Sequence, residues 1–125
     1  MKKLKILVID SSPIIYIGLK SVFKNSNLFD VTTFIDIKNN IIDVLNEFEI
    51  DIIISEINLK DSSVYDILKV LRKNKIEIPI VIFTSENNES KSVKILKSGA
   101  SGFMTKNLKK KNIRKNIKVV SFSKY

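Results

Sequence analysis

Short apolar runs alternate along the chain with longer stretches in which apolar residues recur every three or four positions. The short runs are typical of strands covered on both faces, and the longer stretches are typical of helices that pack through one face. The pattern predicts strands at 4–9, 31–34, 51–55, 80–83 and 101–104.

A helix is predicted after each of these strands. Ser11 and Ser12 are candidate N-caps for the first helix, and Pro13 suits its first position. The second helix is expected to begin at Asp36 or Lys38. The apolar positions of the five helices, in order, are Ile15, Leu19, Val22 and Phe23; Ile41, Ile42, Leu45 and Phe48; Val64, Ile67, Leu68 and Leu71; Val93 and Leu96, with Gly99 as C-cap; and, from Leu108 onward, Ile113, Ile117 and Val120.

Five strand–helix units with short connections predict a parallel sheet with helices on both faces, which is a doubly wound α/β sandwich. A chain of 125 residues suits one such domain. Ligands of these sheets bind outside the carboxyl ends of the strands. The polar residues expected at those ends are Asp10, Ser11, Glu56, Thr84, Ser85 and Lys106.

Four of the five strand ends therefore carry a polar group: two carboxylates (Asp10 and Glu56), one hydroxyl (Thr84) and one ammonium (Lys106). This combination indicates that these residues form one site together and are not merely solvated loop residues. The stretches that carry them resemble the receiver domain of bacterial response regulators. The resemblance rests on KILVID with the three residues that follow it (5–13), and on DIIISEINL, IPIVIFTSENNE and SGASGFMTKN; it spans the chain from about residue 3. It implies a (βα)5 flavodoxin-like fold with strand order 2-1-3-4-5, a receiver domain over 1–125, and the start of a linker at 119–125.

The resemblance also assigns roles to four residues. Asp10 matches the first acid of the family's metal-binding pair, and Lys106 matches the lysine that pairs with the phosphoryl oxygens. Thr84 matches the hydroxyl that bonds the phosphoryl group in the active state, and Phe103 matches the aromatic switch residue. A plain core role for Phe103 is an equally open interpretation.

Two positions depart from the family's pattern. Ser11 stands where the second metal-binding acid is usual, and Glu56 stands where the family has its phosphate-accepting aspartate. The usual three acids need a divalent ion, whereas Asp10 and Glu56 facing Lys106 nearly balance in charge. We therefore expect weak or no Mg²⁺ binding, no other cofactor and a phosphorylation-independent domain. Glu56 is a candidate permanent substitute for phospho-aspartate, reaching Thr84 and Lys106; the rival expectation is a domain locked inactive or controlled by protein contacts.

Composition removes several other functions. The chain has no cysteine and no histidine, which excludes disulfides, thiolate metal sites and histidine-dependent triads. No signal peptide or apolar membrane span is evident, so a cytoplasmic location is expected. The net charge of +9 suggests nucleic acid as a partner, yet 20 lysines beside 22 isoleucines and 12 asparagines also fit A/T-rich codon usage. Arginine, which phosphate recognition prefers, occurs only twice.

The two ends of the chain resemble LuxR-type response regulators in particular. The stretch 10–23, which ends in PIIYIGLKSVF, resembles the opening of that subfamily, and NLKKKNIRKNIKVVSFSKY resembles its last receiver helix and linker. The resemblance implies a sensor histidine kinase as a partner, a homodimer, and DNA binding only through an effector domain that these residues do not contain. A stand-alone receiver is the alternative. Two further alternatives are a flavodoxin-like redox protein and a Mg²⁺-dependent phosphoryl-transfer enzyme. The sequence disfavours the first because it lacks a phosphate-binding loop after the first strand, and it disfavours the second because it lacks the second acid.

Overall fold

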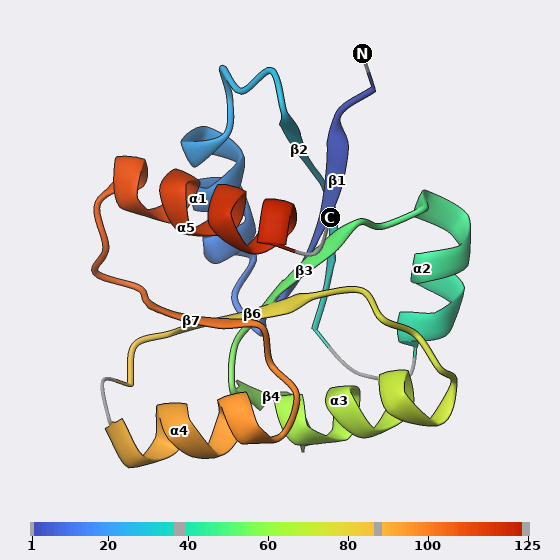
Figure 1. Cartoon of the computed structure of the whole chain (residues 1–125). Helices are drawn as coiled ribbons and strands as arrows, with labels where there is room; N and C mark the ends of the chain where they lie inside the picture. The colour runs from blue at the N-terminus through green and yellow to red at the C-terminus, as the bar shows by residue number, and fades with distance from the viewer. Residues whose placement is uncertain (1, 37–39, 87–88, 124–125) are drawn as a thin grey trace.

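The computed structural model describes residues 2–36, 40–86 and 89–123, and it shows one parallel sheet flanked by helices (Figure 1). The strands of this sheet are β1 (Leu4–Ile9), β2 (Phe29–Ile35), β3 (Ile52–Ser55), β6 (Ile80–Thr84) and β7 (Gly102–Thr105). The described helices are α1 (Pro13–Val22), α2 (Ile41–Phe48), α3 (Val64–Lys73), α4 (Glu89–Lys97) and α5 (Lys110–Ser123). A two-stranded pair, β4 (Asn58–Leu59) with β5 (Ser62–Ser63), lies in the connection after β3.

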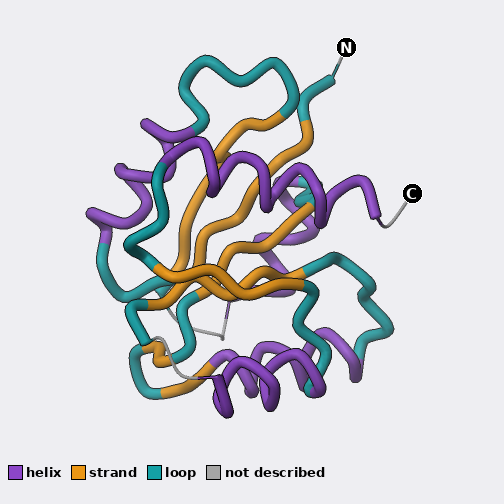
Figure 2. Tube along the Cα trace, turned by 60° about the vertical axis from the view of Figure 1, so that its left-hand side comes forward, coloured by secondary structure: helices purple, strands orange, loops and turns teal. Residues whose placement is uncertain are grey.

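The sheet has the order β2-β1-β3-β6-β7, and all four pairings are parallel. If only the five strands of this sheet are numbered along the chain, without β4 and β5, the order is the predicted 2-1-3-4-5. The doubly wound architecture is therefore confirmed. Helices α1 and α5 cover one face, and α2, α3 and α4 cover the other (Figures 1 and 2). The carboxyl ends of β1 and β3, where the chain leaves for helices on opposite faces, therefore lie side by side.

Alternate residues of the central strands fill two separate apolar cores. Ile52 and Ile54 pack towards α1 and α5, while Ile53 packs towards the other three helices. All three side chains are almost wholly buried. Because both faces are covered, the central strand is apolar at successive positions, which is why its sequence shows a continuous run.

Local signals set the helix ends. Ser12 is the N-cap of α1 and Pro13 its first residue, as predicted. The carboxylate of Asp66 accepts a hydrogen bond of 3.1 Å from the Ser63 backbone N–H at the start of α3. Gly99 follows α4 with φ of +116°, a conformation that side-chain-bearing residues rarely adopt.

The structure contains one element that the sequence did not predict, and it corrects two local predictions. The unpredicted element is the pair β4–β5, whose residue Leu59 is buried in the apolar core. Helix α2 begins at Ile41, so the start at Asp36 is wrong, while the alternative start at Lys38 lies outside the described residues. In α4 the buried residue is Ile95, and the two predicted core positions, Val93 and Leu96, are each 44% exposed. None of the described helices has the length and apolarity that crossing a membrane requires.

Candidate functional site

Backbone pairing at the carboxyl edge of the sheet brings the predicted residues together. Asp10 and Glu56 directly follow β1 and β3, Thr84 ends β6, and Lys106 directly follows β7. The Glu56 N–H donates to the carbonyl of Ile9 at 2.9 Å. The Lys106 N–H donates to the carbonyl of Thr84 at 2.8 Å. These bonds extend the strand pairing by one residue, so the side chains start from fixed positions.

The ammonium of Lys106 bridges the two acids. Its Nζ lies 2.9 Å from Oδ2 of Asp10 and 2.9 Å from Oε1 of Glu56. The side chains of Asp10, Glu56 and Lys106 are 6%, 14% and 20% exposed, so water screens these ion pairs far less than it screens surface pairs. We call these three residues the ionic bridge.

Backbone N–H groups engage the remaining carboxylate oxygens. Oδ1 of Asp10 accepts a hydrogen bond of 2.9 Å from the N–H of Ser12, two residues further on. Oε2 of Glu56 accepts one from the N–H of the next residue, Ile57. Each carboxylate oxygen of the ionic bridge therefore has a donor, which partly offsets the cost of removing two acids from water.

The acids also decide the protonation of Lys106. Burial alone lowers the pKa of a lysine, but the hydrogen bonds and negative charges of Asp10 and Glu56 outweigh it, and the pKa of Lys106 is raised above the ordinary value of 10.5. The ammonium is thus charged throughout the physiological range. The ionic bridge carries one positive and two negative charges and has a formal charge of −1.

Thr84 belongs to the same edge but not to the ionic bridge. Its side chain is almost wholly buried, and its Oγ1 accepts a hydrogen bond of 3.2 Å from the N–H of Glu86. Among the described hydrogen bonds none joins Thr84 to Glu56. Of the two contacts expected for Glu56, the structure therefore contains the one to Lys106 alone.

The other predicted site residues lie at the margin of this arrangement. Ser11 and Ser85 are exposed, and no described hydrogen bond ties either side chain to the ionic bridge. Phe103, in β7, is partly buried and packs against the core beneath α2, α3 and α4. The backbone N–H groups of Ser12 and Ile57 were not predicted as part of the site. An aspartate two residues before a helix N-terminus is a common acceptor for such a group, so the Ser12 contact had a signal in the sequence.

The residues present fit a magnesium ion poorly. Mg²⁺ requires a near-octahedral set of oxygens at about 2.0–2.1 Å, usually including one or two carboxylates that are free to bind it. Here the ammonium of Lys106 lies between the two carboxylates, and the adjacent position is the neutral, exposed Ser11. No group of three or more acidic side chains suited to a metal occurs among the described residues.

Comparisons with known proteins place the chain in a family. Residues 6–118 match the family model of the response regulator receiver domain. Over 119 residues the chain is 28% identical to a nitrate/nitrite response regulator protein homolog of Haemophilus influenzae, covering 95% of this chain and 57% of that protein. It is 30% identical over 103 residues to the cell cycle response regulator CtrA of Brucella ovis, covering 82% of this chain and 44% of that protein.

A solved structure agrees in fold. The crystal structure of a LuxR-family two-component response regulator from Aurantimonas sp. SI85-9A1 superposes with a TM-score of 0.87 at 19% identity, covering 98% of this chain and 87% of that one. The chain spans about half the length of the curated relatives it matches. The parallel sheet, the polar residues at its carboxyl edge and the match over 6–118 together show that this chain belongs to the response regulator receiver domain family.

Proposed function

We propose that this receiver domain works without phosphorylation and without Mg²⁺, and that Glu56 permanently replaces the phosphate-accepting aspartate. The observation that supports the proposal is the ionic bridge, in which Lys106 Nζ lies 2.9 Å from a carboxylate oxygen of both Asp10 and Glu56. The cation that would pair with phosphoryl oxygens in the family's usual site is already paired. We infer a signalling role for the domain and no enzymatic activity.

Two physical arguments support the loss of phosphate transfer. Phosphoryl transfer depends on an acceptor oxygen in line with the donor and beside a metal ion, and a displacement of about 1 Å can lower the rate on the order of a hundredfold. Glu56 is one methylene longer than aspartate, and its two oxygens are engaged by Lys106 and by the N–H of Ile57. Both its reach and its partners therefore oppose attack on a phosphoryl donor.

The same contacts bear on the signalling state. Glu56 takes the place of the phosphoryl group only towards Lys106, because the Thr84 hydroxyl bonds to the N–H of Glu86 instead. A carboxylate also carries less charge and fewer acceptors than a phosphoryl group. We therefore propose a domain held in one state, whose output is controlled by contacts with other proteins, in preference to a fully active mimic.

Labelling with a small-molecule phosphodonor tests this proposal. The natural protein and the Glu56→Asp, Ser11→Asp double variant are incubated with acetyl phosphate and Mg²⁺, and the added mass is located by mass spectrometry. We expect no label on Glu56 in the natural protein and a label on the new aspartate in the double variant. A label on Glu56 at a rate similar to that of the variant would refute the proposal.

The length of the relatives supports a second element of the proposal. Both curated relatives are response regulators in which the matched region is 57% and 44% of the protein. We propose that these residues act within a cytoplasmic two-component system, as a homodimer and together with a DNA-binding effector domain, and that a sensor histidine kinase contacts the domain. Sedimentation equilibrium of the 125-residue domain tests the homodimer, and a monomer at all concentrations would contradict it.

A further inference from the structure

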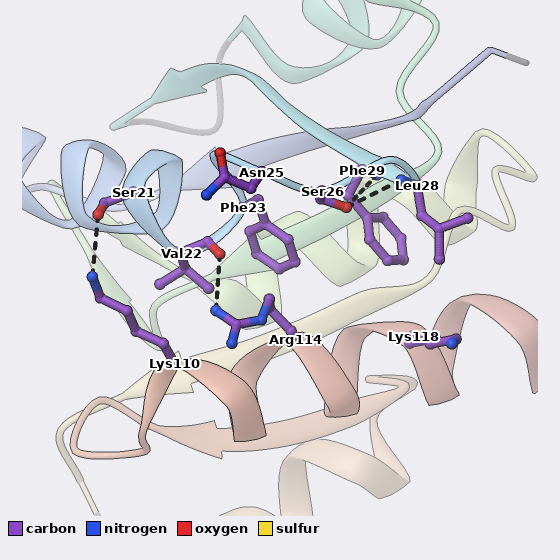
Figure 3. Close-up of a pocket in the computed structure, with 10 residues that line it drawn as sticks. All are labelled: Ser21, Val22, Phe23, Asn25, Ser26, Leu28, Phe29, Lys110, Arg114 and Lys118. Atoms are coloured by element: carbon purple, nitrogen blue, oxygen red, sulfur yellow. Dashed lines mark hydrogen bonds between the residues drawn. The ribbon is translucent and has the colours of Figure 1, made fainter.

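A pocket of about 540 Å³ opens between the C-terminal end of α1, the start of β2 and one side of α5 (Figure 3). It shares no residue with the ionic bridge. Its volume falls in the range of about 300–1,000 Å³ that is typical of small-molecule sites. Its walls carry polar and charged groups over a floor that includes the buried rings of Phe23 and Phe29.

Cationic side chains line one side of the pocket. Lys110, Arg114 and Lys118 succeed one another at intervals of four residues on α5, and Figure 3 shows them along the same side of the pocket. No acidic residue is among the described residues that line it. Like charges four residues apart on a helix repel one another and destabilise the helix, and no acidic side chain among the described residues of the pocket offsets this repulsion. Arg114 is also one of only two arginines in the chain.

The internal contacts of these cations leave most of their charge uncompensated. Arg114 donates to the carbonyl of Val22 at 3.2 Å, and Lys110 Nζ donates to Oγ of Ser21 at 3.3 Å. Both acceptors are neutral, and the C-terminal end of α1 supplies only about half a negative charge. Lys118 has no hydrogen-bond or ion-pair partner among the described residues.

The facing wall adds a hydrogen-bond donor. The Oγ of Ser26 accepts hydrogen bonds from the N–H groups of Leu28, at 3.1 Å, and Phe29, at 3.0 Å. Its two lone pairs are thereby used, which leaves the hydroxyl hydrogen to donate. Within the described part of the chain that hydrogen has no acceptor, and Ser26 lines the pocket opposite α5 (Figure 3).

The spacing of the cations indicates the shape of the ligand. Four residues of helix span about 6 Å, so the row from Lys110 to Lys118 spans about 12 Å. One phosphate ion is too small to contact both ends of such a row, whereas several linked phosphoryl groups are long enough to contact neighbouring cations together. We propose that this pocket binds a small ligand with two or more linked phosphoryl groups, held by Lys110, Arg114 and Lys118 and by the Ser26 hydroxyl.

The probe for this proposal is tripolyphosphate, titrated into the natural protein by calorimetry at low salt. Inorganic phosphate and a short single-stranded oligothymidylate serve as comparison ligands. The test variant is Lys110→Gln, Lys118→Gln, which retains Arg114 and its bond to α1. The control is Lys111→Gln, Lys115→Gln, because both lysines lie on α5, lose the same charge and do not line the pocket.

We expect saturable binding of one tripolyphosphate, weaker binding of inorganic phosphate, and a loss of about tenfold or more in the test variant against less than about threefold in the control. Absence of saturable binding to the natural protein would overturn the proposal. Equal losses in the two variants would also overturn it, since they indicate attraction by net charge alone. Tighter binding of the oligothymidylate than of tripolyphosphate would identify a nucleic-acid surface instead. None of these outcomes depends on whether Glu56 accepts phosphate.

Discussion

Replacement of Lys106 by methionine removes the ammonium from the ionic bridge and keeps most of the apolar stem. Asp10 and Glu56 then face each other with 6% and 14% of their side chains exposed and no cation between them. Removing one partner of a buried ion pair costs about 3–5 kcal/mol, and because Lys106 is 20% exposed we expect about 2–4 kcal/mol. For a domain of this size the loss corresponds to a fall in Tm of roughly 6–15 °C.

Chemical and thermal unfolding of the natural protein and Lys106→Met measure this loss. The matched control is Lys91→Met, because Lys91 Nζ also lies 2.9 Å from a carboxylate, that of Glu86, but the two side chains are 37% and 40% exposed. An exposed pair contributes at most about 1 kcal/mol. Similar losses in the two variants would refute the conclusion that burial makes the ionic bridge important.

Further predictions concern alkaline pH, the core and two glycines. Folding raises the pKa of Lys106, so the charged ammonium contributes its full stabilisation at pH values below the ordinary lysine pKa of 10.5. This stabilisation is lost as the pH rises through the pKa of Lys106 in the folded protein. The urea concentration at the unfolding midpoint, measured from pH 9 to 12, should therefore fall more for the natural protein than for Lys106→Met. Ile53→Ala, at a wholly buried position, should cost about 2–5 kcal/mol in equilibrium unfolding. Gly99→Ala should destabilise the domain, because φ at Gly99 is +116° and the new Cβ would lie 3.2 Å from the Arg72 guanidinium. Gly18→Ala, inside α1 with open space around it, should stabilise the domain by about 0.5–1 kcal/mol. Thermal unfolding should therefore give a lower Tm than that of the natural protein for the first variant and a higher Tm for the second.

The fold was predictable because its signals are redundant. Residues 52–54 place apolar side chains on both faces of the sheet, which requires helices on both sides of it, and the strand ends then fall at one edge. In α4 the signal is ambiguous, because Val93 and Ile95 are both apolar and the sequence does not say which faces the sheet. The structure buries Ile95 and leaves Val93 44% exposed.

The three members of the ionic bridge were predictable from the sequence, but not all of their bonds were. The positions of Asp10, Glu56 and Lys106 follow from strand register, and the opposite charges then favour contact. The contact expected between the carboxylate of Glu56 and the hydroxyl of Thr84 is not among the described hydrogen bonds of the second Glu56 oxygen or of that hydroxyl. Each bonds to a backbone N–H one or two residues away in the chain, and such local choices depend on side-chain torsions that spacing does not specify.

The ionic bridge also has a mechanical consequence for the sheet. Strand β7 is an outer strand, and outer strands ordinarily fray first. Yet Lys106, which follows β7, forms an ion pair with Asp10 at the end of β1. Strand β1 lies two strands further into the sheet than β6, which is the neighbour of β7. Peeling β7 away therefore requires breaking a shielded electrostatic contact as well as its backbone ladder. Amide hydrogens at the Lys106 end of β7 should consequently exchange with solvent more slowly than those of an outer strand that lacks such an ion pair.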